Sequence, residues 1–420
     1  MKSMKYVLSI AFLLVRFAWG APLPEASPDS VGLSAERLTR LDATFQKISD
    51  DKELPGVTLM IARKGKLVYQ KSFGFQDRGQ AKPMTNDAIF RIYSMTKPIV
   101  SVAAMMLVEE GKLSLEEPIS TYLPEFKDMK VGIEKTDANG TASFTTVPAK
   151  RQITVQDLMR HTSGLTYGPP LFDKTTVQKM YQEAGIWSQN WVLADFTKAL
   201  AKVPLAYEPG STYEYSHSTD VLGRVVEIAS GKSLDECVRE RILRPLKMSD
   251  TGFILAGDQL KRLAEPQPNP QTGAKLELLD FTKPTIFFAG GHGLASTAGD
   301  YLRFGQMLLN GGVLEGVRIL GPRTVAYMAS NHVGPAVAVG TVWNPGSGYG
   351  FGLGFAVRKE HGLAEWPGSV GDYFWGGYAG TYFWIDPKEQ LVVTYMSQEI
   401  NKRNHYRILL RDLVYQALTD

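Results

Sequence analysis

The chain has 420 residues, of which 44% are hydrophobic and 21% are charged. This length and composition predict an ordinary globular protein with two or three domains, or with one large domain and an insertion. Lysine and arginine number 46 against 43 acidic residues, and Lys2, Lys5 and Arg16 lie in the first twenty positions. The rest of the chain is therefore formally neutral, which gives no reason to expect binding to nucleic acid or to an anionic membrane surface.

Residues 1–20 have the layout of a secretory signal peptide. Two lysines precede an apolar run at 6–15, and small residues at 18–20 suit a cleavage site. The run is too short to span a bilayer, and no other segment is long and apolar enough to do so; an N-terminal anchor helix is the alternative. We therefore expect an exported protein, periplasmic or secreted, with residues 21–420 as its functional domain.

The chain has one cysteine, Cys237, so it cannot form an internal disulfide. The core alone must then stabilise the fold, even in an exported protein. Because Cys237 lies in a predicted helix, we expect it to be a buried small apolar residue and not a nucleophile.

Predicted strands lie near both ends of the chain, and predicted helices occupy most of the middle. In chain order we expect a helix at 34–48, strands at 56–62 and 66–73, a helix from 94, helices near 154–161, 219–231 and 300–309, strands at 350–357, 380–385 and 390–396, and a helix at 403–418. The polar stretch 130–146 is expected to be a surface excursion.

Strands at both ends and a helical middle predict an α/β fold of the α+β type. We expect an antiparallel sheet built from both chain ends and flanked by helices, with an inserted, mainly helical domain. The sheet part would comprise about 25–93 and 311–420, and the helical part about 94–310.

The strongest chemical signal is Ser94-Met-Thr-Lys97 at the start of a predicted helix. The spacing of three places Lys97 on the same face as Ser94, within reach of the hydroxyl. A serine becomes a good nucleophile when a neighbouring base takes its proton, and the start of a helix offers N–H groups to an oxyanion. The alternative is a serine N-cap followed by a solvated lysine, so the motif needs support from the rest of the chain.

That support comes from five segments in one order along the chain, at 90–97, 153–165, 213–223, 290–301 and 375–377. Together they resemble the serine β-lactamase superfamily, and more narrowly the class C β-lactamase-like esterases known as family VIII carboxylesterases. Each segment is only moderately specific, but the ordered set is specific. The resemblance implies a β-lactamase/transpeptidase-like fold.

The resemblance also implies acyl transfer by three residues. Tyr215 matches the tyrosine of the family's Tyr-x-Asn motif. Lys97 and Tyr215 would deprotonate Ser94 for attack on a carbonyl, Tyr215 would return a proton to the leaving group, and water would then release the acid. Tyr215 can act as a base only if cations such as Lys97 favour the phenolate.

Two positions depart from the β-lactamase pattern. His217 stands where the family has asparagine, and Trp375 stands where β-lactamases have the lysine of Lys-Thr-Gly. Losing that cation removes a charge-assisted contact to a carboxylate, while Trp375 supplies an apolar wall. The resemblance therefore points to neutral esters over penicillins and cephalosporins.

The residues after Trp375 are expected to bind substrate. Gly376 and Gly377 would permit close approach of the backbone to the substrate. The N–H of Tyr378 would complete an oxyanion hole with the N–H of Ser94, although the sequence does not settle the strand register.

None of the six histidines falls in a zinc-binding pattern, so we expect no metal and no other cofactor. His217, close to Tyr215, is expected to line the site, and His292, among glycines, is a further pocket candidate. His161 is expected to satisfy hydrogen bonds at a helix end. A Ser-His-Asp hydrolase is disfavoured because the chain lacks a Gly-x-Ser-x-Gly elbow.

We therefore predict an exported carboxylesterase that cleaves short-chain acyl esters through a Ser94 acyl-enzyme and binds a small-molecule ester or amide. The alternatives are a class C-like β-lactamase, a D-amino-acid peptidase or amidase, an acyltransferase, or a non-catalytic penicillin-binding-like protein. The natural substrate and the oligomeric state stay open.

Overall fold

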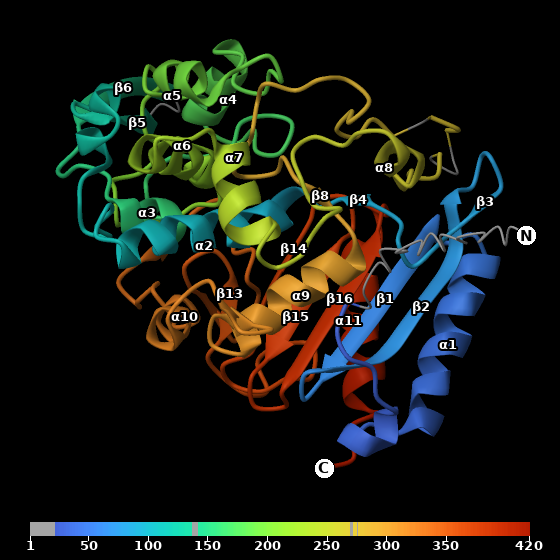
Figure 1. Cartoon of the computed structure of the whole chain (residues 1–420). Helices are drawn as coiled ribbons and strands as arrows, with labels where there is room; N and C mark the ends of the chain where they lie inside the picture. Colours follow the sequence, from blue (N-terminus) through green and yellow to red (C-terminus); the bar gives the residue numbers. More distant parts are fainter. Residues whose placement is uncertain (1–21, 137–141, 269–271, 275) are drawn as a thin grey trace, which may run out of the picture.

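The computed structural model describes residues 22–136, 142–268, 272–274 and 276–420, so the predicted leader lies outside the described residues. Its centre is an eight-stranded antiparallel sheet in the order β12-β13-β14-β15-β16-β1-β2-β3 (Figure 1). The strands are β1 (Gly56–Arg63), β2 (Lys66–Asp77), β3 (Lys82–Pro83), β12 (Tyr349–Phe351), β13 (Ala356–Arg358), β14 (Tyr373–Gly376), β15 (Tyr382–Asp386) and β16 (Leu391–Ser397). β1 lies between β2 and β16, so both chain ends build one sheet, as predicted.

Helices cover both faces of this sheet. α9 (Ala298–Leu309) packs on β15, β16 and β1, whereas α1 (Ala35–Asp50) packs against β2 and α11 (Arg403–Tyr415). Figure 1 shows α9 in front of the strands and α11 behind them. The predicted boundary at 310 places α9 with the helical part, although its partners are sheet strands.

Most of the remaining elements form a mainly helical group beside one end of the sheet (Figure 1). At its centre α2 (Thr96–Glu109) contacts α6 (Ser218–Ser230) and α7 (Leu234–Val238), and nearly all of its residues are buried. A helix that is apolar on all sides belongs in such an interior position. The other α-helices and strands outside the central sheet are β4 (Phe90–Arg91), β5 (Lys130–Thr136), β6 (Ala142–Pro148), α3 (Val155–Met159), α4 (Thr176–Glu183), α5 (Leu193–Leu200), β7 (Thr212–Tyr213), α8 (Asp258–Lys261), β8 (Ala295–Ser296), β9 (Val313–Leu314), β10 (Val317–Arg318), α10 (Pro322–Met328) and β11 (Ala338–Val339).

Two predicted segments differ from the structure. The stretch 350–357 is not one strand but the hairpin β12–β13, because Gly354 adopts φ +106° between the two paired segments. The stretch 130–146 contains β5 paired with β6, so the expected excursion is an ordered hairpin where it is described.

Two further expectations concern burial and membrane spans. Cys237 is free and buried, as predicted. None of the described helices is both long and apolar enough to span a membrane.

Candidate active site

Ser94 lies in a 3₁₀ turn, η2 (Tyr93–Met95), that leads directly into α2. Its side chain is partly exposed, whereas the helix behind it is buried. Tyr93 has φ +43°, a conformation that is rare for a tyrosine. Backbone strain of this kind persists only where the surroundings hold it, and it clusters at functional sites.

The Lys97 side chain is completely buried, and its ammonium group contacts three oxygen atoms. The distances from Nζ are 3.3 Å to Ser94 Oγ, 3.2 Å to the Tyr167 hydroxyl and 2.8 Å to the Gly291 carbonyl oxygen. A buried cation needs such partners because water cannot solvate it. The structure thus brings the predicted Ser94 and Lys97 together and adds two partners from other segments.

Tyr215 follows β7 and lies over the same ammonium group. Lys97 Nζ is 4.6 Å from the centroid of its ring, a cation–π distance. Its hydroxyl accepts a hydrogen bond of 3.2 Å from Trp375 Nε1. In the described part of the chain, no hydrogen bond joins Tyr215 directly to Ser94.

Trp375 is more than the apolar wall that the sequence predicts. It lies in β14, is 4% exposed and packs between Tyr215 and Phe351, with ring centroids 5.4 and 5.2 Å away. Since its N–H points to the Tyr215 hydroxyl, its first contact is with a predicted catalytic residue and not with solvent.

The end of β14 packs tightly against the turn that carries the nucleophile. A Cβ on Gly377 would lie 2.1 Å from Thr381 Oγ1 and 2.5 Å from the Ile92 carbonyl oxygen. A Cβ on Gly376 would lie 2.6 Å from the Arg407 guanidinium group. The glycines therefore make room for protein atoms, whereas the sequence predicts room for substrate.

Tyr378 comes next and lies beside the same turn. Its ring meets the edge of the Tyr93 ring, with centroids 5.7 Å apart. The Tyr378 N–H donates no hydrogen bond to any described residue. A free N–H on a residue whose ring packs against this turn suits the stabilisation of an oxyanion.

Behind Lys97, His217 and Asp220 form a buried pair in which His217 Nδ1 lies 2.9 Å from Asp220 Oδ2. Burial opposes ionisation of Asp220, but the hydrogen bond from His217 and the nearby Lys97 lower its pKa to about 2. The ionised Asp220 has no proton to donate, so His217 Nδ1 must carry the hydrogen. Burial lowers the pKa of His217, which therefore stays neutral at neutral pH.

His292 lies at the edge of this pair. Its Nδ1 is 3.8 Å from Asp220 Oδ1, and burial lowers its pKa to about 4. The His217 ring is only 1% exposed and lies behind Tyr167, with ring centroids 4.4 Å apart. Both predicted pocket histidines are thus near Lys97, but His217 is enclosed by protein.

His161, expected at a helix end, is buried beside Tyr215, with ring centroids 4.7 Å apart. Its Nδ1 lies 3.3 Å from Ser216 Oγ. Burial and the nearby Lys97 cation lower the pKa of His161, so it supports the site as a neutral ring.

The sequence analysis missed Tyr167, Asp220 and Gly291. Asp220 follows His217 by three residues at the start of a predicted helix, and that spacing is one signal that could have found it. Gly291 lies in the segment 290–301, but a backbone contact leaves no mark in a sequence. Burial raises the pKa of Tyr167 well above its usual value, so its hydroxyl stays protonated beside Lys97.

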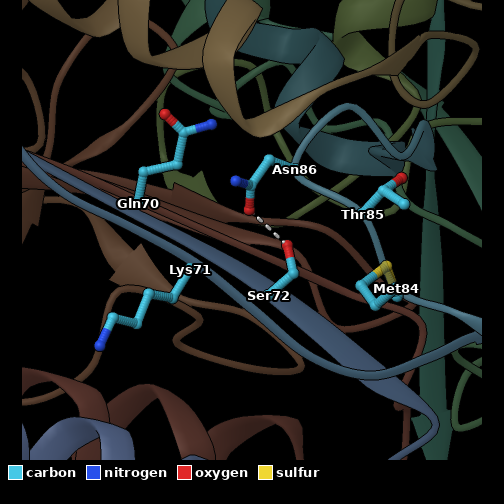
Figure 2. Close-up of a pocket in the computed structure, with 6 residues that line it drawn as sticks. All are labelled: Gln70, Lys71, Ser72, Met84, Thr85 and Asn86. Atoms are coloured by element: carbon cyan, nitrogen blue, oxygen red, sulfur yellow. Dashed lines mark hydrogen bonds between the residues drawn. The ribbon is translucent and has the colours of Figure 1, made fainter.

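A surface depression on the sheet contains none of these residues (Figure 2). It is lined by Gln70, Lys71, Ser72, Met84, Thr85 and Asn86. Several of its polar groups already have partners, since the Ser72 hydroxyl donates to Asn86 Oδ1 at 2.7 Å and Lys71 pairs with Asp42 outside the depression. Within the described ranges, no group of three His, Cys, Asp or Glu side chains could hold a metal ion.

Known proteins resemble this chain over most of its length. A family model described as Beta-lactamase matches residues 41–416. Protein Rv1367c of Mycobacterium tuberculosis (strain ATCC 25618 / H37Rv) is 35% identical over 370 residues, which cover 85% of this chain and 88% of that protein. Esterase EstB of Burkholderia gladioli is 31% identical over 411 residues, which cover 92% and 98%. The solved structure of EstCE1, described as a hydrolase with promiscuous acyltransferase activity, has a TM-score of 0.73 at 28% identity and covers 90% of this chain and 99% of its own.

Proposed function

The chain belongs to the beta-lactamase family of serine hydrolases, and from that premise we propose that it is a carboxylesterase acting on short-chain acyl esters through Ser94. The observation that carries the proposal is the contact of 3.3 Å between the buried Lys97 Nζ and the Ser94 hydroxyl. The esterase name of EstB, which aligns with 92% of the chain, supports an ester as the substrate class.

In the proposed reaction, the Tyr215 phenolate, which the Lys97 cation stabilises, takes the proton of Ser94 as Oγ bonds to the ester carbonyl carbon. The N–H groups of Ser94 and Tyr378 stabilise the resulting oxyanion. The bond to the alcohol then breaks, and the leaving oxygen takes a proton from Tyr215. Water attacks the acyl-enzyme by the same route, which releases the carboxylic acid and restores Ser94.

Two contacts fit Tyr215 for this role. The Lys97 cation faces its ring, and the Trp375 N–H donates to its hydroxyl oxygen. Both stabilise negative charge on the phenolate. Because Trp375 uses a lone pair of the oxygen and not its hydrogen, the Tyr215 proton is free to move toward a leaving group.

The proposed preference for neutral esters rests on position 375. The indole of Trp375 stands where β-lactamases have a lysine, and its N–H donates a hydrogen bond to the Tyr215 hydroxyl. No ammonium group at this position can pair with the carboxylate of a penicillin or cephalosporin. A neutral ester does not need that contact.

A fluorophosphonate probe tests the nucleophile directly. We expect the probe to modify Ser94, as located by peptide mass spectrometry, and the Ser94→Ala variant to stay unlabelled and folded. Lys97→Ala and Tyr215→Phe should each slow labelling by about a hundredfold, the scale of general acid–base groups. No labelling of the wild type at high probe concentration would contradict the proposal and favour a non-catalytic binding protein.

A second activity, acyl transfer to an alcohol, is favoured by the description of EstCE1. The Ser94 acyl-enzyme would then be attacked by a bound alcohol in place of water. Adding 1-butanol to a reaction with p-nitrophenyl butyrate should yield butyl butyrate, which gas chromatography detects. Butyric acid as the sole product would contradict acyl transfer but not hydrolysis.

Export is proposed from the sequence of residues 1–20 alone. The mass of the protein recovered outside the cytoplasm should match a chain that begins after Gly20. A full-length chain in that fraction would contradict cleavage at this position.

A further inference from the structure

Asp220 is a buried carboxylate to which the proposed reaction gives no direct role. It lies in the first turn of α6 and is 0% exposed. Its Oδ1 accepts a hydrogen bond of 2.7 Å from the Gly291 N–H, and its Oδ2 accepts one of 2.9 Å from His217 Nδ1–H. Because each oxygen accepts a hydrogen bond from a different donor, the carboxylate group is held in one orientation.

Gly291 connects this carboxylate to Lys97. Its carbonyl oxygen lies 2.8 Å from Lys97 Nζ, the shortest of the three contacts of that ammonium group. A Cβ on Gly291 would lie 2.8 Å from Asp220 Oδ2, and one on Gly290 would lie 2.4 Å from the Thr219 carbonyl oxygen. The two glycines therefore allow the loop to lie directly against the start of α6.

We infer that Asp220 is a positioning residue that acts through Gly291 to hold the Lys97 ammonium group against Ser94. The inference rests on the proposed function, because the position of Lys97 matters only if Lys97 activates Ser94. The negative charge of Asp220 also favours the presence of the Lys97 cation at this buried position. A buried anion close to a buried cation offsets part of the desolvation of both groups.

Two variants separate geometry from charge. Asp220→Asn keeps an oxygen that can accept the Gly291 N–H but removes the charge, whereas Asp220→Ala removes both. A displacement of a reacting group by about 1 Å can lower a rate by about 10²-fold. We expect Asp220→Ala to slow the modification of Ser94 by about that factor and Asp220→Asn to have an intermediate rate.

Fluorophosphonate labelling gives both a rate and an endpoint. If Lys97 is displaced in Asp220→Ala, the variant should reach the stoichiometric labelling endpoint of the wild type, but at a lower rate. Its kcat for p-nitrophenyl butyrate should be lower and its KM unchanged. A lower endpoint at an unchanged rate would indicate a misfolded fraction and would overturn the inference.

Asp300→Asn is the matched control. Asp300 is a buried carboxylate that accepts the Asp250 N–H at 2.8 Å, but its bonds go to Asp250 and Thr251 and not to Gly291. The labelling rate of the Asp300→Asn variant should equal that of the wild type.

The two proposals fail in different ways. An unlabelled wild type contradicts the proposed function. A labelled wild type together with Asp220→Ala labelled at the same rate overturns the positioning role alone. If Asp220→Ala does not fold, Asp220→Asn decides, because a wild-type rate would overturn the inference and a slower rate with a full endpoint would support it.

Discussion

Each hydrogen of the Lys97 ammonium group has its own oxygen atom, and the three oxygens come from separate parts of the chain. Ser94 is three residues away on the same turn, whereas Tyr167 and Gly291 lie on loops 70 and 194 positions further on. A cation held in this way has little freedom, so the geometry at Ser94 depends on all three partners.

The hydrogen bond from Trp375 to Tyr215 gives a prediction for a single residue. Trp375→Phe keeps an aromatic ring but removes the N–H that donates to Tyr215. A neutral hydrogen bond contributes about 1 kcal/mol, so kcat for an ester should fall by about fivefold. Trp384→Phe is the control, because the Trp384 N–H, also buried, has no hydrogen-bond partner among the described residues. Equal kcat values for the two variants would show that the bond to Tyr215 has no role in turnover.

Local spacing made part of the site predictable. Ser94 and Lys97 are three residues apart on one helix turn, and their contact follows from helix geometry. The contact between Asp220 and Gly291 spans 71 positions and that between Trp375 and Tyr215 spans 160. Such contacts depend on how the elements pack, and no sequence spacing specifies them.

At the scale of elements, the end of β14 places the predicted oxyanion N–H beside η2. Gly377→Ala would push a methyl group against Thr381 and the Ile92 carbonyl group. The turn must then move, and we expect a loss of kcat of about 10²-fold, the effect of misplacing a reacting group by about 1 Å. Gly334→Ala, at a position with open space around the Cβ, should leave kcat unchanged. A fully active Gly377→Ala would contradict the role of this turn.

The start of α9 makes stability depend on pH. Burial raises the pKa of Asp300 to about 7 from 3.8. Between these values the folded chain retains a proton that the unfolded chain has lost, so the free energy of unfolding falls as pH rises. Asp300→Asn cannot ionise, so urea unfolding should show the variant gaining stability relative to the wild type from pH 4 to pH 7. A difference that is constant with pH would contradict this shift.

The elements themselves were largely predictable, since the strands at both chain ends and the helices α1, α6, α9 and α11 follow their hydrophobic periodicity. The hairpin at Gly354 was not, because the glycines at 350, 352 and 354 in one apolar run do not reveal which of them turns the chain. The pairing of β12 with β13 in the structure identifies Gly354 as the glycine that turns the chain.

At the scale of the whole molecule, the two chain ends are joined in one sheet and the last helix is fixed to it by buried charges. Asp372 lies 2.7 Å from Arg358 Nε on β13 and 3.2 Å from Arg411 Nη1 on α11. Removing one member of a buried ionic group leaves its partners uncompensated, at about 3–5 kcal/mol.

Asp372→Ala should therefore lower the free energy of unfolding by about 3–5 kcal/mol in urea. The control Asp258→Asn breaks an exposed ion pair with Lys261 and should have no measurable effect. Equal stability of Asp372→Ala and the wild type would show that the ion pairs of Asp372 are not needed to hold α11 on the sheet.

The most direct test of the central claim is a paired kinetic assay on p-nitrophenyl butyrate and nitrocefin, with Ser94→Ala as the blank. We predict that kcat/KM for the ester exceeds that for the lactam by several orders of magnitude and that Ser94→Ala turns over neither. Comparable or faster nitrocefin hydrolysis would contradict the esterase assignment, and ester turnover by Ser94→Ala would contradict Ser94 as the nucleophile.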